Sequence, residues 1–111
     1  MPRISPALSR HANEAARLLG LLIRQHRLER KMTAAELAQR AGVSRGLVQR
    51  AERGEPGCAI GAVFELATIV GVPLFEADPM QFNAMRAATE KTLKLLPSSA
   101  RGPAGKVDDD F

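Results

Sequence analysis

The side chains that could bind a metal or act as nucleophiles are few in this sequence and widely spaced. They are the isolated residues His11, His26 and Cys58 and the acidic run Asp108, Asp109 and Asp110. The isolated residues match no metal-ligand spacing, and adjacent carboxylates in a polar tail are more often solvated than bound to a cation. No catalytic triad, phosphate-binding glycine-rich loop or acid–base pair is visible. We therefore expect no metal, no cofactor and no enzymatic activity.

The chemistry that remains is that of a basic surface. Lysine and arginine number 16 against 12 acidic residues, and the excess lies in residues 1–60, where 11 basic residues stand against 5 acidic ones. Residues 61–111 reverse the balance, with 5 basic and 7 acidic residues. A basic N-terminal half suits contact with nucleic-acid phosphates. Charge alone leaves an ordinary solvated face equally open.

Composition and length indicate one helical domain. A chain of 111 residues with 45% hydrophobic and only 4% aromatic residues must build an aliphatic core, which favours helix packing over a sheet. The apolar stretches at 18–23 and 59–75 are too short or too interrupted to cross a membrane. Since a single cysteine forms no internal disulfide, we expect a cytoplasmic protein.

Helical periodicity gives the elements that must position the basic side chains. Apolar residues at spacings of three and four predict an all-α five-helix bundle with helices at 13–30, 34–41, 45–53, 60–70 and 79–96. We expect a flexible N-terminal arm over 1–12 and a flexible acidic tail over 97–111, which leaves 13–96 as the folded domain. The turn at 72–75 is expected to direct the Leu74 and Phe75 side chains back against the domain.

Two of the predicted helices are short and joined by a tight turn. Thr33 and Glu36 form a capping-box pattern at the start of the first one, and Ser44 offers an N-cap for the second. The residues spaced for a close crossing of two helices are Ala38, Gly42 and Val48. Together they predict a helix-turn-helix over residues 33–53.

This segment resembles the phage-repressor (XRE, or Cro/C1) family of helix-turn-helix regulators. The resemblance covers about residues 20–75 and is carried by Leu37–Ser44, Glu52–Gly54 and Val70–Val72. It implies the lambda-repressor-like fold and a sequence-specific repressor of double-stranded DNA with a near-palindromic operator. In that family the third helix lies in the major groove.

The resemblance also implies roles for individual side chains. The base-reading positions are Arg45, Gly46, Gln49 and Arg50, where arginine suits guanine and glutamine suits adenine. The phosphate-contacting positions are Thr33, Arg40, Ser44 and Arg53, with capping alone as the other reading of Ser44. The family's structural ion pair between the first and third helices is matched by Arg27 and Glu52.

Two positions depart from the family pattern. Gly46 occupies a first-turn position where a side chain would often point at the groove, so it either permits close backbone approach or reads nothing. Ala34 stands where the family often has a glutamine that contacts phosphate, with Arg40 or Arg24 as the candidate substitute.

A domain of this size contacts only half of an operator, so we expect a homodimer with recognition helices about 34 Å apart. The last predicted helix offers an apolar stripe for the interface at Phe82, Met85, Thr89, Leu93 and Leu96. Packing of this stripe on its own domain is the alternative.

The short acidic tail also makes the chain resemble the DNA-binding (HipB-like) antitoxins that neutralise HipA-type kinases. That resemblance implies a tail that orders on a toxin partner through Asp108, Asp109, Asp110 and Phe111. A tail that only aids solubility is the alternative.

The competing function is a protein-interaction module of the same fold, which would keep its activity when Arg45 and Gln49 become alanine.

Overall fold

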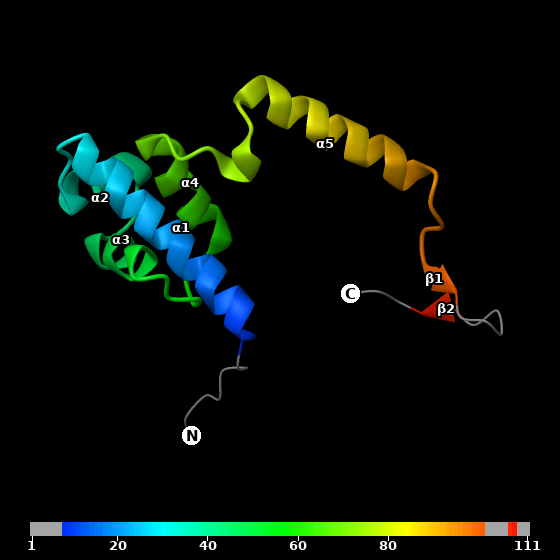
Figure 1. Cartoon of the computed structure of the whole chain (residues 1–111), viewed down its shortest axis with the longest axis horizontal. Helices are drawn as coiled ribbons and strands as arrows, with labels where there is room; N and C mark the ends of the chain where they lie inside the picture. The colour runs from blue at the N-terminus through cyan, green and yellow to red at the C-terminus, as the bar shows by residue number, and fades with distance from the viewer. Residues whose placement is uncertain (1–7, 102–106, 109–111) are drawn as a thin grey trace. The chain divides into compact units, whose positions relative to one another are not determined.

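The structure, a computed structural model, describes residues 8–101 and 107–108, and within them it contains five α-helices and one pair of short strands (Figure 1). The elements are α1 (Arg10–Glu29), α2 (Ala34–Ala41), α3 (Arg45–Glu52), α4 (Ile60–Val70), the 3-10 turn η1 (Leu74–Glu76), α5 (Pro79–Lys94), β1 (Ala100–Arg101) and β2 (Val107–Asp108). The chain divides into two compact units, Met1–Leu74 and Phe75–Phe111. The predicted all-α class with five helices is confirmed.

Helix α1 begins at Arg10, three residues before the predicted start. Ser9 has an extended backbone, and its hydroxyl accepts a hydrogen bond from the Ala12 N–H at 3.1 Å, so Ser9 is the N-cap. The sequence pattern missed this start because Ala12, at the third helical position, cannot complete a capping box. Residues 1–7 of the predicted arm lie outside the described residues.

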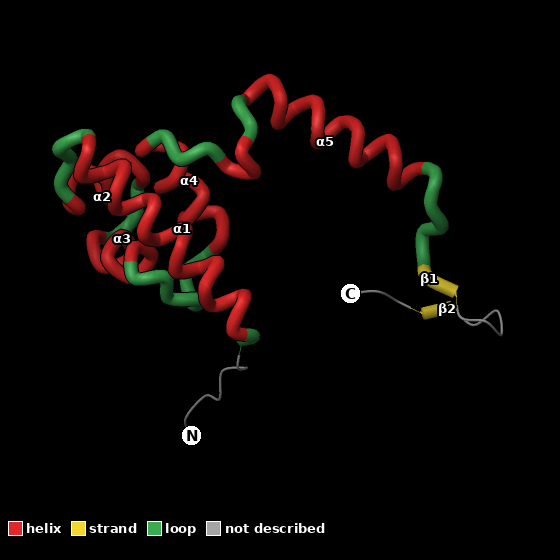
Figure 2. Tube along the Cα trace, viewed as in Figure 1, coloured by secondary structure: helices red, strands yellow, loops and turns green. Residues whose placement is uncertain are grey.

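The core of the first unit is formed by α1 to α4. Helix α1 contacts α3 and α4, and α2 contacts the same two helices. The largest side chains with no exposed area are Ile23, Leu37, Val48, Leu66 and Val70, so each of the four helices contributes at least one. Burial of each such side chain stabilises the fold by about 1.5–3 kcal/mol. Figure 2 shows how short α2 and α3 are beside α1, so their positions depend on this packing more than on their own helix propensity.

Helix α5 belongs to the second unit and starts as the sequence predicts. Asp78 and Gln81 form a complete capping box, with hydrogen bonds of 2.8 and 2.9 Å, and Pro79 occupies the first helical position. No residue of α5 is buried. The helix ends at Lys94, with Leu95 as its C-cap, rather than at Leu96.

The turn before α5 corrects one expectation. Leu74 packs against the core of the first unit, but Phe75 is 68% exposed. Phe75 has a left-handed backbone with a φ of 56°, and its ring lies 5.8 Å from that of Phe82. The left-handed residue directs the side chain toward the first turn of α5, which a simple turn pattern does not predict.

The segment expected as a tail contains a small antiparallel ladder. Ala100 pairs with Asp108 and Arg101 with Val107. Composition did not predict these strands, because the segment is rich in glycine and charge and short of apolar residues.

Candidate nucleic-acid interface

Both ends of α2 and the start of α3 are fixed by local features that the sequence predicted. The Thr33 hydroxyl accepts from the Glu36 N–H and the Glu36 carboxylate accepts from the Thr33 N–H, both at 3.0 Å. These bonds, the one from the Thr33 N–H foremost, hold the pKa of Glu36 below its ordinary value. Gly42 ends α2 with a left-handed φ of 69°, and the Ser44 hydroxyl caps α3 by accepting from the Leu47 N–H at 3.0 Å.

Helix α3 has one buried face and one exposed face. Val48 is fully buried and Ala51 is 4% exposed, and Ala38 of α2 is buried opposite them. The small Ala38 side chain permits the close crossing that the helix-turn-helix requires. The exposed face carries Arg45, Gln49 and Arg50. The structure thus exposes three of the sequence-predicted base readers on one helix.

A buried ion pair holds α3 against α1. Arg27 donates to both carboxylate oxygens of Glu52, from Nε at 2.6 Å and from Nη2 at 2.9 Å, and both residues are under 9% exposed. The Nη1 group of Arg27 also donates to the Met32 carbonyl oxygen at 2.9 Å. The hydrogen bond to Glu52 raises the pKa of Arg27 further above its already high value. The predicted structural pair is confirmed, and the third hydrogen bond extends it to the chain before α2.

Sequence reasoning missed the glycines that bring α1 onto the end of α3. A Cβ atom on Gly20 would overlap the carbonyl oxygen of Ala51 and lie 2.8 Å from that of Glu52. A Cβ atom on Gly54, whose φ is 76°, would lie 2.5 Å from the Arg17 Cα. The only sequence signal was the presence of Gly20 within a strongly helical segment, where glycine is otherwise unfavourable.

Gly46 and Arg50 are adjacent in space. The Arg50 guanidinium passes the first turn of α3 so closely that a Cβ atom on Gly46 would lie 3.2 Å from Nη1. Gly46 therefore leaves room for the Arg50 guanidinium and contributes no side chain of its own. This gives a physical reason for the unusual glycine at that position.

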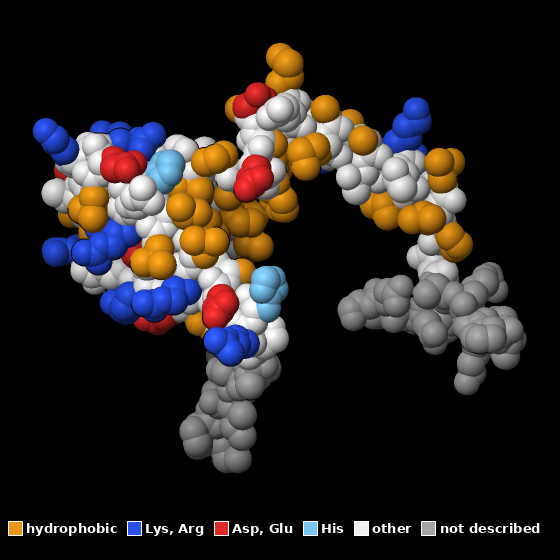
Figure 3. Space-filling view, viewed as in Figure 1, with side chains coloured by type: hydrophobic (Ala, Val, Ile, Leu, Met, Phe, Trp, Pro, Cys, Tyr) orange, Lys and Arg blue, Asp and Glu red, His pale blue; other side chains and the backbone are white. Residues whose placement is uncertain are grey.

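The side chains predicted to contact phosphate differ in whether they already form hydrogen bonds or ion pairs within the protein. The hydroxyl oxygens of Thr33 and Ser44 already cap α2 and α3, but each hydroxyl keeps its own proton to donate. Arg53 forms an ion pair with Glu55 at 2.7 Å, and both side chains are largely exposed. Arg40 is exposed in the last turn of α2. Figure 3 shows lysine and arginine side chains gathered over the region of α1, α2 and α3.

The remaining predicted residues belong to the second unit. Phe82, Met85 and Leu93 are 38%, 49% and 61% exposed along α5. Phe75, Phe82 and Met85 also line a shallow groove of about 390 Å³, with Arg86, Thr89 and Glu90 completing its wall. Asp108 lies in β2. The other predicted tail residues, Asp109, Asp110 and Phe111, lie outside the described residues.

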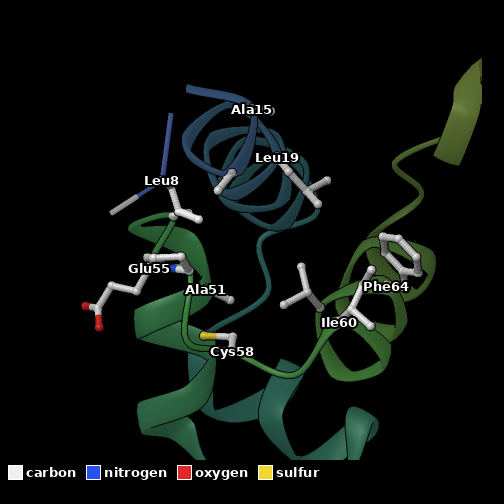
Figure 4. Close-up of a pocket in the computed structure, with 12 residues that line it drawn as sticks. Leu8, Ala15, Leu19, Ala51, Glu55, Cys58, Ile60 and Phe64 are labelled. Atoms are coloured by element: carbon white, nitrogen blue, oxygen red, sulfur yellow. The ribbon is translucent and has the colours of Figure 1, made fainter. Parts of the chain in front are cut away.

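A second groove, of about 370 Å³, lies in the first unit between α1, the loop after α3 and the start of α4 (Figure 4). Its lining is almost entirely apolar, with Ala15, Leu19, Ile60 and Phe64 around it. The single charged side chain in the lining is Glu55, which points away from the groove in Figure 4. The groove therefore offers an apolar surface and places no acid or base over it.

Two further features are absent from the described residues. Their His, Cys, Asp and Glu side chains form no group of three that could hold a metal ion. None of the helices described for this chain is long and apolar enough to cross a bilayer.

Comparison with known families gives one match. Residues 18–80 match the family model of a helix-turn-helix domain, which spans α2 and α3 together with most of α1, all of α4 and the start of α5. No curated protein matches the chain. The matched segment contains the capping box, the left-handed Gly42, the Arg27–Glu52 pair and the exposed face of α3.

Proposed function

Because the chain belongs to the helix-turn-helix domain family and is on that ground a DNA-binding regulator, we propose that it is a sequence-specific transcriptional repressor. Helix α3 would lie in the major groove of operator DNA. The observation that carries the proposal is the division of α3 into two faces. Arg45, Gln49 and Arg50 are exposed, while Val48 and Ala51 are buried in the core and Glu52, buried at the end of the helix, binds Arg27.

The chemistry of the exposed face suits direct reading of base edges. A guanidinium from Arg45 or Arg50 makes two hydrogen bonds to guanine, and the Gln49 amide makes two to adenine, each pair contributing about 1–3 kcal/mol of discrimination. Gly46 lets the backbone of the first turn approach the DNA beside Arg50. Phosphate contacts fix the register of the helix on the duplex, and the candidates are Thr33, Ser44, Arg40 and Arg53.

We propose that the repressor acts as a homodimer on a near-palindromic operator. One α3 helix covers only half of such a site, and two copies related by a two-fold axis read both halves. The support for a dimer interface on α5 is its apolar stripe, in which Phe82, Met85 and Leu93 are all exposed. A stripe of this kind on an exposed helix is typical of an interaction surface.

We further propose that the protein regulates its own promoter in the cytoplasm and neutralises a HipA-like kinase toxin through its acidic C-terminal residues. The support is the run of three aspartates followed by Phe111, because carboxylates and an aromatic anchor suit a basic, apolar pocket. Deletion of residues 105–111 should abolish toxin binding in a pull-down with the purified kinase and leave DNA binding unchanged. Unchanged affinity for the kinase would reject the antitoxin role alone.

The decisive experiment is footprinting on DNA from the protein's own promoter region, with scrambled DNA as competitor. Specific binding should exceed non-specific binding by about a thousandfold or more at physiological salt. Arg45→Ala and Gln49→Ala should remove the footprint without changing the melting temperature, since both side chains are exposed. Glu65→Gln, an exposed change on α4, is the matched control and should leave the footprint intact.

A protein-interaction module of the same fold is the second candidate, and the exposed apolar stripe of α5 favours it. The two functions differ in one result. A DNA reader loses its regulatory activity in the Arg45→Ala and Gln49→Ala variants, whereas an interaction module keeps it. Weak binding that depends only on salt, without a footprint, would also favour the interaction module.

A further inference from the structure

We propose that Arg17 and Arg24 of α1 contact DNA phosphates beside the groove that α3 occupies. The DNA interface then extends beyond the helix-turn-helix onto the first helix of the chain. This inference rests on the proposed function, which supplies the DNA, and it extends the interface to α1, where the sequence indicated only Arg24, as a candidate substitute for a phosphate-contacting glutamine.

The two arginines share one side of α1. Arg10, Arg17 and Arg24 follow one another at intervals of seven residues within a single helix, so each lies about two turns from the next. Arg17 and Arg24 are exposed. Arg10 is also exposed but forms an ion pair with Glu14 at 3.4 Å. Arg17 and Arg24 are therefore the members of this row that are best placed for a new partner.

Contacts of the backbone place this side of α1 next to the end of α3. Arg17 precedes Gly20 by three residues and Arg24 follows it by four, so both are helical neighbours of Gly20. Gly20 lies directly against the carbonyl groups of Ala51 and Glu52, the last residues of α3. The Arg17 backbone lies against Gly54, just after α3. The two arginines therefore flank the line along which α1 meets the end of the recognition helix.

The local charge also favours phosphate. The two nearest carboxylates of α3 and the loop after it are already paired, Glu52 with Arg27 and Glu55 with Arg53. Neither Arg17 nor Arg24 forms an ion pair within the part of the chain that the structure describes. A guanidinium presents a planar set of donors that matches phosphate oxygens. The basic surface of this region is visible in Figure 3.

The two side chains are far enough apart to reach different phosphates. Seven residues of α-helix advance about 10 Å. Phosphates of one strand follow one another every 3.4 Å or so along the duplex axis, so about three of them cover the same length. Arg17 and Arg24 can thus bind separate phosphates of one strand without a change in the helix.

The test compares the double variant Arg17→Ala/Arg24→Ala with Lys91→Ala/Lys94→Ala, which removes the same charge from exposed positions of α5. Binding to the operator and to unrelated DNA is measured by fluorescence anisotropy between about 50 and 200 mM salt. In the arginine variant, the slope of log K against log salt should flatten by about 1.8 per protomer, or 0.9 for each lost phosphate contact. The ratio of operator to unrelated binding should stay at the wild-type value. The lysine variant should keep the wild-type slope.

An arginine variant with the wild-type slope overturns the inference, and so does one whose preference for the operator changes, because phosphate contacts carry no sequence information. Arg17→Lys/Arg24→Lys keeps the charge and should restore most of the slope, which separates loss of contact from loss of fold. If the wild-type protein shows no operator preference, the proposed repressor function fails. The slopes on unrelated DNA then still decide whether these arginines contact phosphate.

Discussion

The backbone of α1 at Gly20 lies directly against the carbonyl oxygen of Ala51 in α3, with no space for a side chain between them. Glycine is normally unfavourable in the middle of a helix because it gains conformational freedom on unfolding. Here its missing Cβ sets the distance between α1 and α3. The same contact brings Arg27 within hydrogen-bonding distance of Glu52.

Replacement of Gly20 by alanine should therefore destabilise the protein, although alanine is the better helix former. The new methyl group meets backbone atoms that cannot rotate away, and overpacking of this kind costs about 1–3 kcal/mol. Gly61→Ala is the matched control, since Gly61 is an exposed glycine of α4 with no atom within 4 Å of an added Cβ. The control should stabilise the protein by about 0.5–1 kcal/mol in urea unfolding. Equal effects of the two substitutions would contradict the close contact.

Removal of one partner of the Arg27–Glu52 pair should be among the most damaging changes in the first unit. Arg27→Met leaves the Glu52 carboxylate buried and without its guanidinium, and such changes cost about 3–5 kcal/mol. The double variant Arg27→Met/Glu52→Leu should recover much of that loss in chemical denaturation, because it leaves no buried charge. Arg10→Ala breaks the exposed pair with Glu14 and should change stability by less than about 1 kcal/mol. If the double variant is no more stable than Arg27→Met, the loss of stability in Arg27→Met comes from lost packing and not from a buried unpaired charge.

The capping box of α2 should make stability depend on acid pH. The pKa of Glu36 is lowered in the folded state, so its contribution is present above the pKa of the unfolded chain and is lost as pH falls through the folded pKa. Glu36→Gln should thus be less stable than wild type at neutral pH, and the difference should shrink below about pH 4. Urea unfolding of both proteins at pH 7 and at acid pH measures it. A constant difference at all pH values would assign the effect to the side chain's shape instead of its charge.

The apolar stripe of α5 should determine the oligomeric state. Phe82→Asp and Leu93→Asp place a charge in the proposed interface and should convert a dimer to a monomer in sedimentation at micromolar concentration. Met80→Asp is the control, because Met80 is 82% exposed and lies on the opposite side of the helix. A wild-type monomer whose operator lacks two-fold symmetry would falsify the dimer.

Local chemistry allowed much of the site to be predicted from the sequence. The capping box of Thr33 and Glu36, the left-handed Gly42 and the Ser44 cap each involve residues within three positions of one another. Such patterns determine the ends of helices directly. The Arg27–Glu52 pair spans 25 residues and was predicted only through a family resemblance.

Other features that depend on the approach of distant segments were not predicted. The role of Gly20 arises from two carbonyl groups more than 30 residues away, and nothing in its neighbours indicates them. Phe75 was wrongly expected to pack against the domain, because an apolar side chain in a turn usually does so. Its left-handed backbone instead directs the ring toward Phe82. The start of α1 was placed late because Ser9 caps it alone, without a glutamate or glutamine at Ala12.

Glu52 is buried at the C-terminal end of α3 and accepts both hydrogen bonds from Arg27, whereas Arg45, Gln49 and Arg50 are exposed to solvent. Under the proposed function, attachment of the helix and the choice of DNA sequence depend on different residues of the same eight-residue segment. The outer residues can change by mutation without loosening the helix from its support. A new operator specificity can therefore arise, or be engineered, by exchange of the exposed residues of α3 alone, while the rest of the domain stays unchanged.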